Sequence, residues 1–298
     1  MNRLIGYLRL ARPANIVTAI ADILAGIAIA YAGTLFVLPQ THSIILLVLS
    51  TACLYGGGVV LNDVFDADLD KVERPERPIP SGLISKRSAG VLGMFLMLLG
   101  ILFAAFAHHD LLSISTVIAI VIALAATTYD KWAKHHAFLG PLTMGFCRGM
   151  NLLLGISVIP AAVEMYGFIG LVPMIYIFAI TMISRGEVHG SARTPLYVAA
   201  LLYLFVVIAI LLAAFYMDTM PVTLPFAALF IFMIFIPLQK AINKPDGPRI
   251  GKAVKSGVLS LIIMNAAWAA AVGNWIFALI ILALLPVSLL LARAFAVT

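Results

Sequence analysis

Charged side chains are scarce in this chain. They make up 11% of its 298 residues, whereas hydrophobic residues make up 63%. Soluble domains carry about 25% charged residues, so the composition excludes a soluble globular protein. Cysteine is nearly absent too, and Cys53 and Cys147 both lie in apolar stretches. This placement favours buried apolar thiols over a disulfide or a cysteine-rich metal site.

Long apolar runs dominate the sequence instead. A helix needs roughly 20 apolar residues to cross a ~30 Å hydrocarbon core, and such runs recur throughout the chain, whose mean hydropathy is +1.11. They predict up to ten spans, at 15–38, 44–62, 88–107, 111–128, 138–161, 166–183, 196–216, 221–238, 255–272 and 275–293. No linker separates folded units, so residues 1–298 are predicted to form a single all-α polytopic membrane domain.

Basic residues alternate between the two sides of this predicted bundle. Nearly every Lys and Arg falls in the N-terminal segment, in the loops 63–87, 129–136, 184–194 and 239–255, or at Arg293. The intervening loops contain acidic residues and no basic ones. By the positive-inside rule, the basic loops and both termini are predicted to be cytoplasmic in a cell membrane, with loop 239–255 contacting anionic membrane lipids. The net charge of +6 then requires no nucleic-acid partner.

Four of the thirteen acidic residues lie within 61–70. Asp63, Asp66 and Asp70 are three and four residues apart, so on a helix they lie within about 60° of one another. Asn62 lies at the edge of the same arc, while Asp68 projects to the opposite side. Like charges at this spacing repel unless a cation neutralises them, and an oxygen-only ligand set favours Mg²⁺. A solvated acidic loop is the alternative.

A proline-rich turn follows the aspartates. Segment 74–82 contains three prolines, which stop the helix, and it carries Arg74 and Arg77. Carboxylates hold cations, while arginines pair with phosphate oxygens. Acidic and basic groups at one mouth of the bundle therefore suit a metal-bound anion, and a solvated salt-bridge network is the alternative.

These residues carry a resemblance to a known family. The pattern Asn62-Asp63-x-x-Asp66-x-x-x-Asp70, followed by Arg77-Pro78-x-Pro80-Ser81-Gly82, resembles the first signature of the UbiA superfamily of intramembrane prenyltransferases. Arg-Pro-Ala-Asn at 12–15 is also similar to that family, and the residues at 129–136, 140–141 and 147–151 look most like its EboC-type subgroup. The likeness is strongest over residues 1–135 and rests on span layout from about residue 195 onward.

The resemblance implies a bundle of nine to ten transmembrane helices around a lipid-open cavity with cytoplasmic cap loops. It also implies a transferase that uses Mg²⁺ and an isoprenyl diphosphate to prenylate an acceptor, which the sequence leaves unidentified; no protein partner is evident. The physics agrees, because ionising an allylic diphosphate needs cations around the leaving group. It also needs a dry chamber around the carbocation.

The second aspartate motif of the family is eroded in this chain. In loop 184–191 Glu187 is the one carboxylate, and Ser184 and Ser191 share its helical face. Glu187 is therefore predicted to hold a second Mg²⁺ with serine or water oxygens, unless a single metal suffices. The resemblance gives the metal ligands Asn62, Asp63, Asp66, Asp70 and Glu187, and the four carboxylates among them are the predicted catalytic set.

Polar and cationic residues near the same mouth are predicted to contact the diphosphate. They are Asn15, Arg77, Tyr129, Lys131, Lys134, Arg148 and Arg185. The family often has a Tyr and a Lys four residues apart, but Lys134 follows Tyr129 by five, or about 140° on a helix. Lys134 therefore needs an irregular loop to act in this way, and Lys131 is the substitute. Anchoring at the membrane interface is the alternative for both lysines.

Two charges fall inside predicted spans. Asp22 and Arg148 are costly in lipid unless they face the bundle interior or a wet cavity. Arg148 shares a helix face with Asn151, so contact with substrate is one expectation. An Asp22–Arg148 ion pair that only fixes helix packing is the other.

Two further functions stay open from the sequence. The eroded second motif suggests a non-catalytic protein that binds or carries a polyprenyl lipid. A cation-coupled secondary transporter would also use carboxylates. Transporters, however, place them near the midplane between repeated halves, whereas these carboxylates lie at one mouth and no internal repeat is evident.

Overall fold

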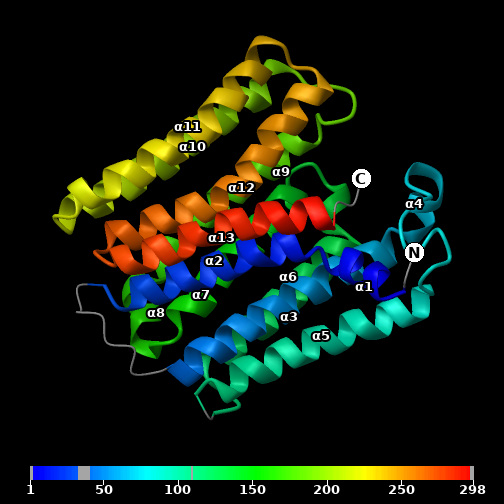
Figure 1. Cartoon of the computed structure of the whole chain (residues 1–298), viewed down its shortest axis with the longest axis horizontal. Helices are drawn as coiled ribbons and strands as arrows, with labels where there is room; N and C mark the ends of the chain where they lie inside the picture. Colours follow the sequence, from blue (N-terminus) through cyan, green and yellow to red (C-terminus); the bar gives the residue numbers. More distant parts are fainter. Residues whose placement is uncertain (1–2, 33–40, 109, 296–298) are drawn as a thin grey trace.

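The computed structural model describes residues 3–32, 41–108 and 110–295, and in these ranges the chain is helical with no β-strand. The elements, in chain order, are α1 (Arg3–Ala11), α2 (Pro13–Ala30), α3 (Thr41–Phe65), α4 (Ala67–Glu73), α5 (Lys86–Phe106), α6 (Ile114–Lys131), η1 (Ala133–His135), α7 (Leu139–Ile156), α8 (Pro160–Tyr166), η2 (Gly167–Gly170), α9 (Leu171–Ser184), α10 (Arg193–Tyr216), α11 (Met220–Asn243), α12 (Gly247–Ala271) and α13 (Trp275–Ala294). Figure 1 shows the long helices running along a common direction.

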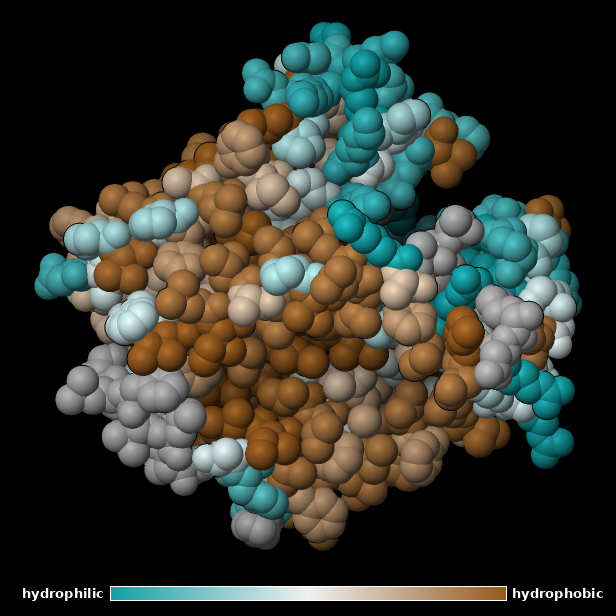
Figure 2. Space-filling model, viewed as in Figure 1, coloured by the Kyte–Doolittle hydropathy of each residue, from teal (hydrophilic) through white to brown (hydrophobic). Residues whose placement is uncertain are grey.

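Nine helical segments of the described ranges are long and apolar enough to cross a membrane, counting Pro160–Ser184 as one. The α7 helix, at the predicted span 138–161, falls outside this set by composition, but it packs against α2, α6 and α9. Figure 2 shows a broad hydrophobic surface between hydrophilic regions, as a lipid-facing belt requires. The chain is therefore a multi-pass membrane protein, and the predicted all-α bundle of nine to ten spans is confirmed.

Basic residues gather at one end of the bundle, among them Arg3 and Arg9 of α1, Lys71 of α4 and Arg293 of α13. The start of α1, the whole of α4 and the end of α13 lie at this end in Figure 1. The turn after α4 is packed rather than loose, because Ile79 and Ile84 are buried against Leu10 of α1 and Val60 of α3. We call this region the basic end.

Glycines bring α2 and α7 into backbone contact. A Cβ on Gly26 would lie 2.3 Å from the carbonyl oxygen of Leu152, and a Cβ on Gly155 would lie 2.4 Å from that of Ile23. Small residues at such crossings allow close helix packing in lipid, where association depends on van der Waals contact and hydrogen bonds. This contact places the polar residues of α2 opposite those of α7.

The aspartate-bearing segment bends without losing its register. Helix α3 ends at Phe65 and α4 begins at Ala67, yet the amide of Asp66 donates to the carbonyl of Asn62 at 2.9 Å, and the amide of Asp70 to that of Asp66 at 2.8 Å. The i→i−4 pattern thus continues through the junction. Side chains at 63, 66 and 70 consequently keep the shared face that their spacing predicts.

Candidate functional site

Two arginines neutralise the buried part of the aspartate face. Arg77 Nη1 donates to Asp70 Oδ2 at 2.7 Å and lies 3.5 Å from Asp63 Oδ1. Arg12 Nη2 donates to the same Asp63 oxygen at 2.6 Å. Asp63 and Asp70 are 4% and 2% exposed. Carboxylates this buried require paired cations, and the proline turn with the start of α2 supplies them.

Arg12 is a site residue that the sequence analysis did not include. It precedes Pro13 at the start of α2 and has φ +48°, a left-handed conformation that is uncommon for a residue other than glycine. This backbone turns the chain between α1 and α2 while its guanidinium reaches Asp63 on α3. Arg12 is the first residue of the Arg-Pro-Ala-Asn pattern at 12–15, and this pattern is the sequence signal for it.

Lys134 pairs with Asp66, the aspartate of this face that neither arginine contacts. Its Nζ lies 2.5 Å from Asp66 Oδ1 and 3.4 Å from Asn62 Oδ1, while Asn62 Nδ2 donates to Asp66 Oδ2 at 3.2 Å. Lys134 reaches the cluster because α6 ends at Lys131 and the 3₁₀ turn η1 follows. Lys131 itself is exposed and its ammonium sits 4.4 Å from the ring centroid of Trp132. The irregular loop required by the five-residue spacing is therefore present, and Lys131 lies away from the cluster.

Arg185 supports the turn that carries Lys134. Its Nη2 donates to the carbonyl oxygen of His136 at 2.6 Å and to that of Lys134 at 3.3 Å. Arg185 forms no hydrogen bond or ion pair with the first-motif carboxylates among the described residues. In the structure Arg185 therefore stabilises the η1 turn through these backbone hydrogen bonds.

Glu187 lies on the loop between α9 and α10. Its side chain is exposed, and partial desolvation raises the pKa of its carboxyl while the charge of Arg74 opposes that rise. In Figure 2 a recess at the upper right separates the hydrophilic region that includes this loop from the one around α4. Within the described ranges Glu187 forms no salt bridge with Lys or Arg.

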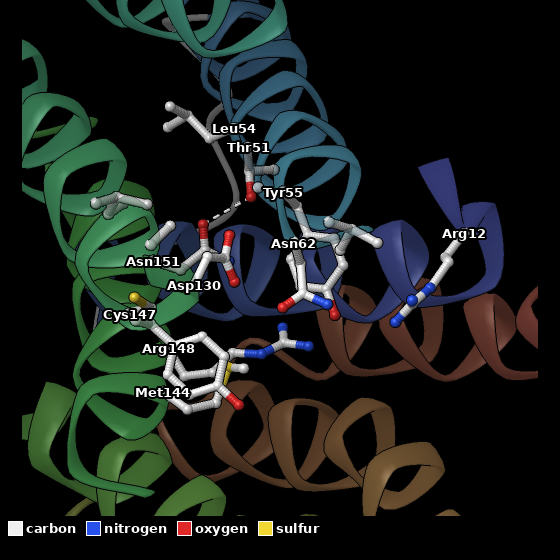
Figure 3. Close-up of a pocket in the computed structure, with 15 residues that line it drawn as sticks. Arg12, Thr51, Leu54, Tyr55, Asn62, Asp130, Met144, Cys147, Arg148 and Asn151 are labelled. Carbon is white, nitrogen blue, oxygen red and sulfur yellow. Dashed lines mark hydrogen bonds between the residues drawn. The ribbon is translucent and has the colours of Figure 1, made fainter. Parts of the chain in front are cut away.

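A cavity of about 230 Å³ lies beside the aspartate face, enclosed by α3, α6 and α7 (Figure 3). Arg12, Asn62, Tyr129 and Asp130 line it toward the basic end. Its middle wall is apolar, with Leu54, Val59, Ile122, Ala126 and Met144 among the lining residues. Pockets of this kind, apolar with a few convergent polar groups, are typical of small-molecule sites. Asn15 does not line the cavity, and its half-buried side chain forms no hydrogen bond with the described residues.

The inner wall of the cavity carries a buried ion pair. Arg148 Nη1 lies 2.5 Å from Asp22 Oδ2, and Arg148 Nη2 donates to Thr18 Oγ1 at 2.6 Å. Asn151 and Asn265 also donate to the Asp22 carboxylate, at 3.0 and 2.7 Å. The expected ion pair is therefore present, and Arg148 lines the cavity as well. Asn265 was missed by the sequence analysis.

Asp130 is a further site residue that the sequence analysis did not include. It is 4% exposed, it lines the cavity near the basic end, and its Oδ2 is buried without a hydrogen-bond partner. Native structures contain few such atoms. Its position next to Tyr129 at the end of an apolar span was the one signal available from sequence.

The donors of the first motif fit a hard divalent cation. They are oxygen atoms of carboxylates and one amide, the set that Mg²⁺ prefers. The ammonium of Lys134 already lies against two of these oxygens, on Asn62 and Asp66. It supplies there the positive charge that a metal ion would supply. No group of three or more His, Cys, Asp or Glu side chains is preassembled for a metal in the described part of the chain. The carboxylates at 63, 66 and 70 are each paired with Arg or Lys instead.

Comparison with known proteins gives one family. A family model described as the UbiA prenyltransferase family matches residues 19–257. The digeranylgeranylglyceryl phosphate synthase of Methanothrix thermoacetophila is 32% identical over 148 residues, which are 50% of this chain and 52% of that protein. The chain spans about half the length of the curated relatives it matches.

Solved structures share the fold. One, concerning digeranylgeranylglyceryl phosphate synthase in membranes, matches with a TM-score of 0.64 at 22% identity and covers 91% of this chain and 99% of its own. A UbiA homologue from Archaeoglobus fulgidus bound to GPP and Mg²⁺ matches with a TM-score of 0.54 at 16% identity, covering 86% of this chain and 99% of its own. At these identities the likeness concerns the fold alone.

Proposed function

The chain belongs to the UbiA prenyltransferase family, and on this premise we propose that it transfers an isoprenyl group from an isoprenyl diphosphate to an acceptor, using Mg²⁺. One observation carries the proposal: paired acidic and basic side chains adjoin a cavity with an apolar wall. The diphosphate requires charge, while the isoprenyl chain requires an apolar wall. The cavity and its charged neighbours supply both.

The paired charges permit an exchange of partners when the donor binds. Asn62, Asp63, Asp66 and Asp70 would hold Mg²⁺, which supplies positive charge to the leaving diphosphate. The basic groups that now neutralise these carboxylates then turn to diphosphate oxygens. Guanidinium groups suit this task because they bind phosphate through two parallel hydrogen bonds.

The apolar wall protects the reacting carbon. Excluding water strengthens the electrostatic interactions inside the site and prevents hydrolysis of a reactive intermediate. Tyr129 and Arg148 line this space, so we retain both as substrate contacts. Arg148 contributes from within its ion pair with Asp22, at the wall away from the aspartate face.

The remaining predicted site residues have weaker support. Asn15, Lys131, Arg185 and Glu187 make no contact with the aspartate face among the described residues. They remain predictions. Arg12 joins the proposed diphosphate contacts on the strength of its ion pair with Asp63.

We also propose that the basic end faces the cytoplasm of a cell membrane. The alternation of basic loops supports this orientation, and loop 239–255 carries lysines suited to anionic lipid headgroups. The EboC-type subgroup remains a prediction from the sequence pattern, while the curated relatives are named digeranylgeranylglyceryl phosphate synthases. The acceptor is the part of the reaction that a substrate screen must identify.

The experiment uses the full chain in nanodiscs. Labelled geranyl diphosphate is incubated with Mg²⁺ and a lipid extract, and both bound label and prenylated product are measured. Asp66→Asn is expected to abolish both, and Asp68→Asn is the matched control because Asp68 projects into solvent with 72% of its side chain exposed. Binding without product supports a polyprenyl-lipid carrier, and ion-driven uptake into proteoliposomes supports a transporter.

A further inference from the structure

Asp130 lies at the last turn of α6, beside the cavity. It is 96% buried, since only 4% of its surface is exposed, and its Oδ2 has no hydrogen-bond partner. Figure 3 shows its carboxyl group directed into the space toward which Asn62 also points. A buried carboxylate needs either a cation or hydrogen-bond donors. The helices around Asp130 supply neither to this oxygen.

The charges around Asp130 are those of the first motif. Lys134, Asp66, Asp63 and Arg12 are the charged groups that act on its carboxyl. Asp130 therefore lies within the electrostatic reach of the first motif, although the sequence analysis gave it no role in the site. Asp130 comes from α6, whereas the aspartates of the first motif come from α3 and α4.

Glu187 occupies a different neighbourhood. The charge that acts on its carboxyl is that of Arg74, and the recess in Figure 2 lies between its loop and the region around α4. The carboxylate expected from the eroded second motif therefore faces the charge of Arg74, whereas the charges of the first motif act on Asp130.

The Lys134 ammonium marks a position for a cation beside Asn62 and Asp66. It contacts oxygens of Asn62 and Asp66 at 3.4 and 2.5 Å, and it is the first among the charges acting on Asp130. If the lysine turns to a diphosphate oxygen, the three side chains lose their shared positive charge. Three oxygen donors around a vacated positive charge suit a hard divalent cation.

We propose that Asp130 is a carboxylate ligand of a divalent cation held at the basic end of the cavity together with Asn62 and Asp66. This ligand supplies from α6 the carboxylate that the second motif lacks. The proposal rests on the proposed function for its donor substrate, but the metal site itself requires no turnover.

The test measures Mn²⁺ binding to the full chain in nanodiscs by electron paramagnetic resonance, with Mn²⁺ in place of Mg²⁺. Binding is measured without and with geranyl diphosphate, because the Lys134 ammonium occupies the position until a diphosphate draws it away. Asp130→Asn is expected to weaken Mn²⁺ binding by about tenfold or more, the scale on which disturbed metal sites lose affinity. Asp68→Asn is the control and is expected to bind Mn²⁺ within about twofold of the unmodified chain, because 72% of the Asp68 side chain is exposed. Unchanged Mn²⁺ affinity in Asp130→Asn overturns the proposal.

A second variant guards against loss of folding in the first. Asp130→Cys replaces the hard oxygen with a soft thiolate, which favours Cd²⁺. Cd²⁺ is expected to bind this variant about tenfold more tightly than Asp130→Asn, in which Cys147 is equally present. Equal Cd²⁺ affinities in the two variants contradict the proposal.

Binding of geranyl diphosphate separates the two claims. If the unmodified chain binds Mn²⁺ through Asp130 but no geranyl diphosphate, the proposed function fails and the metal site stands. If Mg²⁺-dependent geranyl diphosphate binding is present while Asp130→Asn keeps its Mn²⁺ affinity, the metal ligand fails alone. A chain that binds no Mn²⁺ overturns both.

Discussion

Arg77 bridges Asp63 and Asp70, with Nη1 at 3.5 Å from Asp63 Oδ1 and 2.7 Å from Asp70 Oδ2. The two carboxylates are two helical turns apart in sequence, and one guanidinium from the proline turn contacts both, while Arg12 supplies the second positive charge at Asp63. This relationship explains how the aspartates share a face in a protein with so few charges. It also ties the turn after α4 to the end of α3.

Removing Arg77 is expected to destabilise the basic end. Arg77→Ala leaves Asp70 buried without its cation, a loss that typically costs about 3–5 kcal/mol. Thermal unfolding in detergent measures the effect, with Arg74→Ala as the control because Arg74 is exposed on the same turn. Equal melting temperatures for the two variants would show that Arg77 does not hold this turn.

The two neighbouring lysines are expected to differ in donor binding. Lys134→Ala removes a charge-assisted contact worth about 1.5–3 kcal/mol, so Mg²⁺-dependent binding of geranyl diphosphate should weaken by about tenfold or more. Lys131→Ala should change it by less than about twofold, because Lys131 lies over Trp132. Calorimetric titration of each variant measures the affinity, and a larger effect from Lys131 would reverse the assignment.

Replacing one member of the buried Asp22–Arg148 pair is expected to lower the free energy of unfolding more than replacing both. Arg148→Met alone strands Asp22, which is fully buried, and should cost about 3–5 kcal/mol. The double variant Asp22→Leu with Arg148→Met removes both charges and should recover part of that stability. Unfolding measurements that show simple additivity would argue against a coupled ion pair.

Acid is expected to erase the effect of Asp68 on stability. Hydrogen bonds from Lys71 and Lys86 hold the pKa of Asp68 below its ordinary value of 3.8. Its contribution is therefore fully present above that ordinary value and is lost as the pH falls through the lowered one. The melting temperatures of the unmodified chain and Asp68→Asn should differ slightly at pH 7 and converge at lower pH. A difference that grows in acid has the wrong sign for this account.

The sequence predicts the local features of this protein well. Spacing alone places Asp63, Asp66 and Asp70 on one face, and the structure keeps that face through the bend at Asp66. Apolar runs and loop charge give the number of spans because both reflect physics that acts on each segment separately.

Long-range partners are not predictable in the same way. Asp63 pairs with Arg12 across 51 positions, and Asp22 accepts from Asn265 across 243. Neither separation leaves a periodic trace in the sequence. Asp130 is not predictable for a related reason. What marks it is that the surrounding helices give its buried Oδ2 no hydrogen-bond donor, and this shows only in the folded chain.

The central claim is Mg²⁺-dependent prenyl transfer at the aspartate face. It is tested most directly by following labelled geranyl diphosphate in nanodiscs containing the unmodified chain, Asp66→Asn or Asp68→Asn. The account predicts Mg²⁺-dependent binding and labelled product for the unmodified chain and Asp68→Asn, and neither for Asp66→Asn. Equal product from Asp66→Asn, or no Mg²⁺-dependent binding by the unmodified chain, would contradict it.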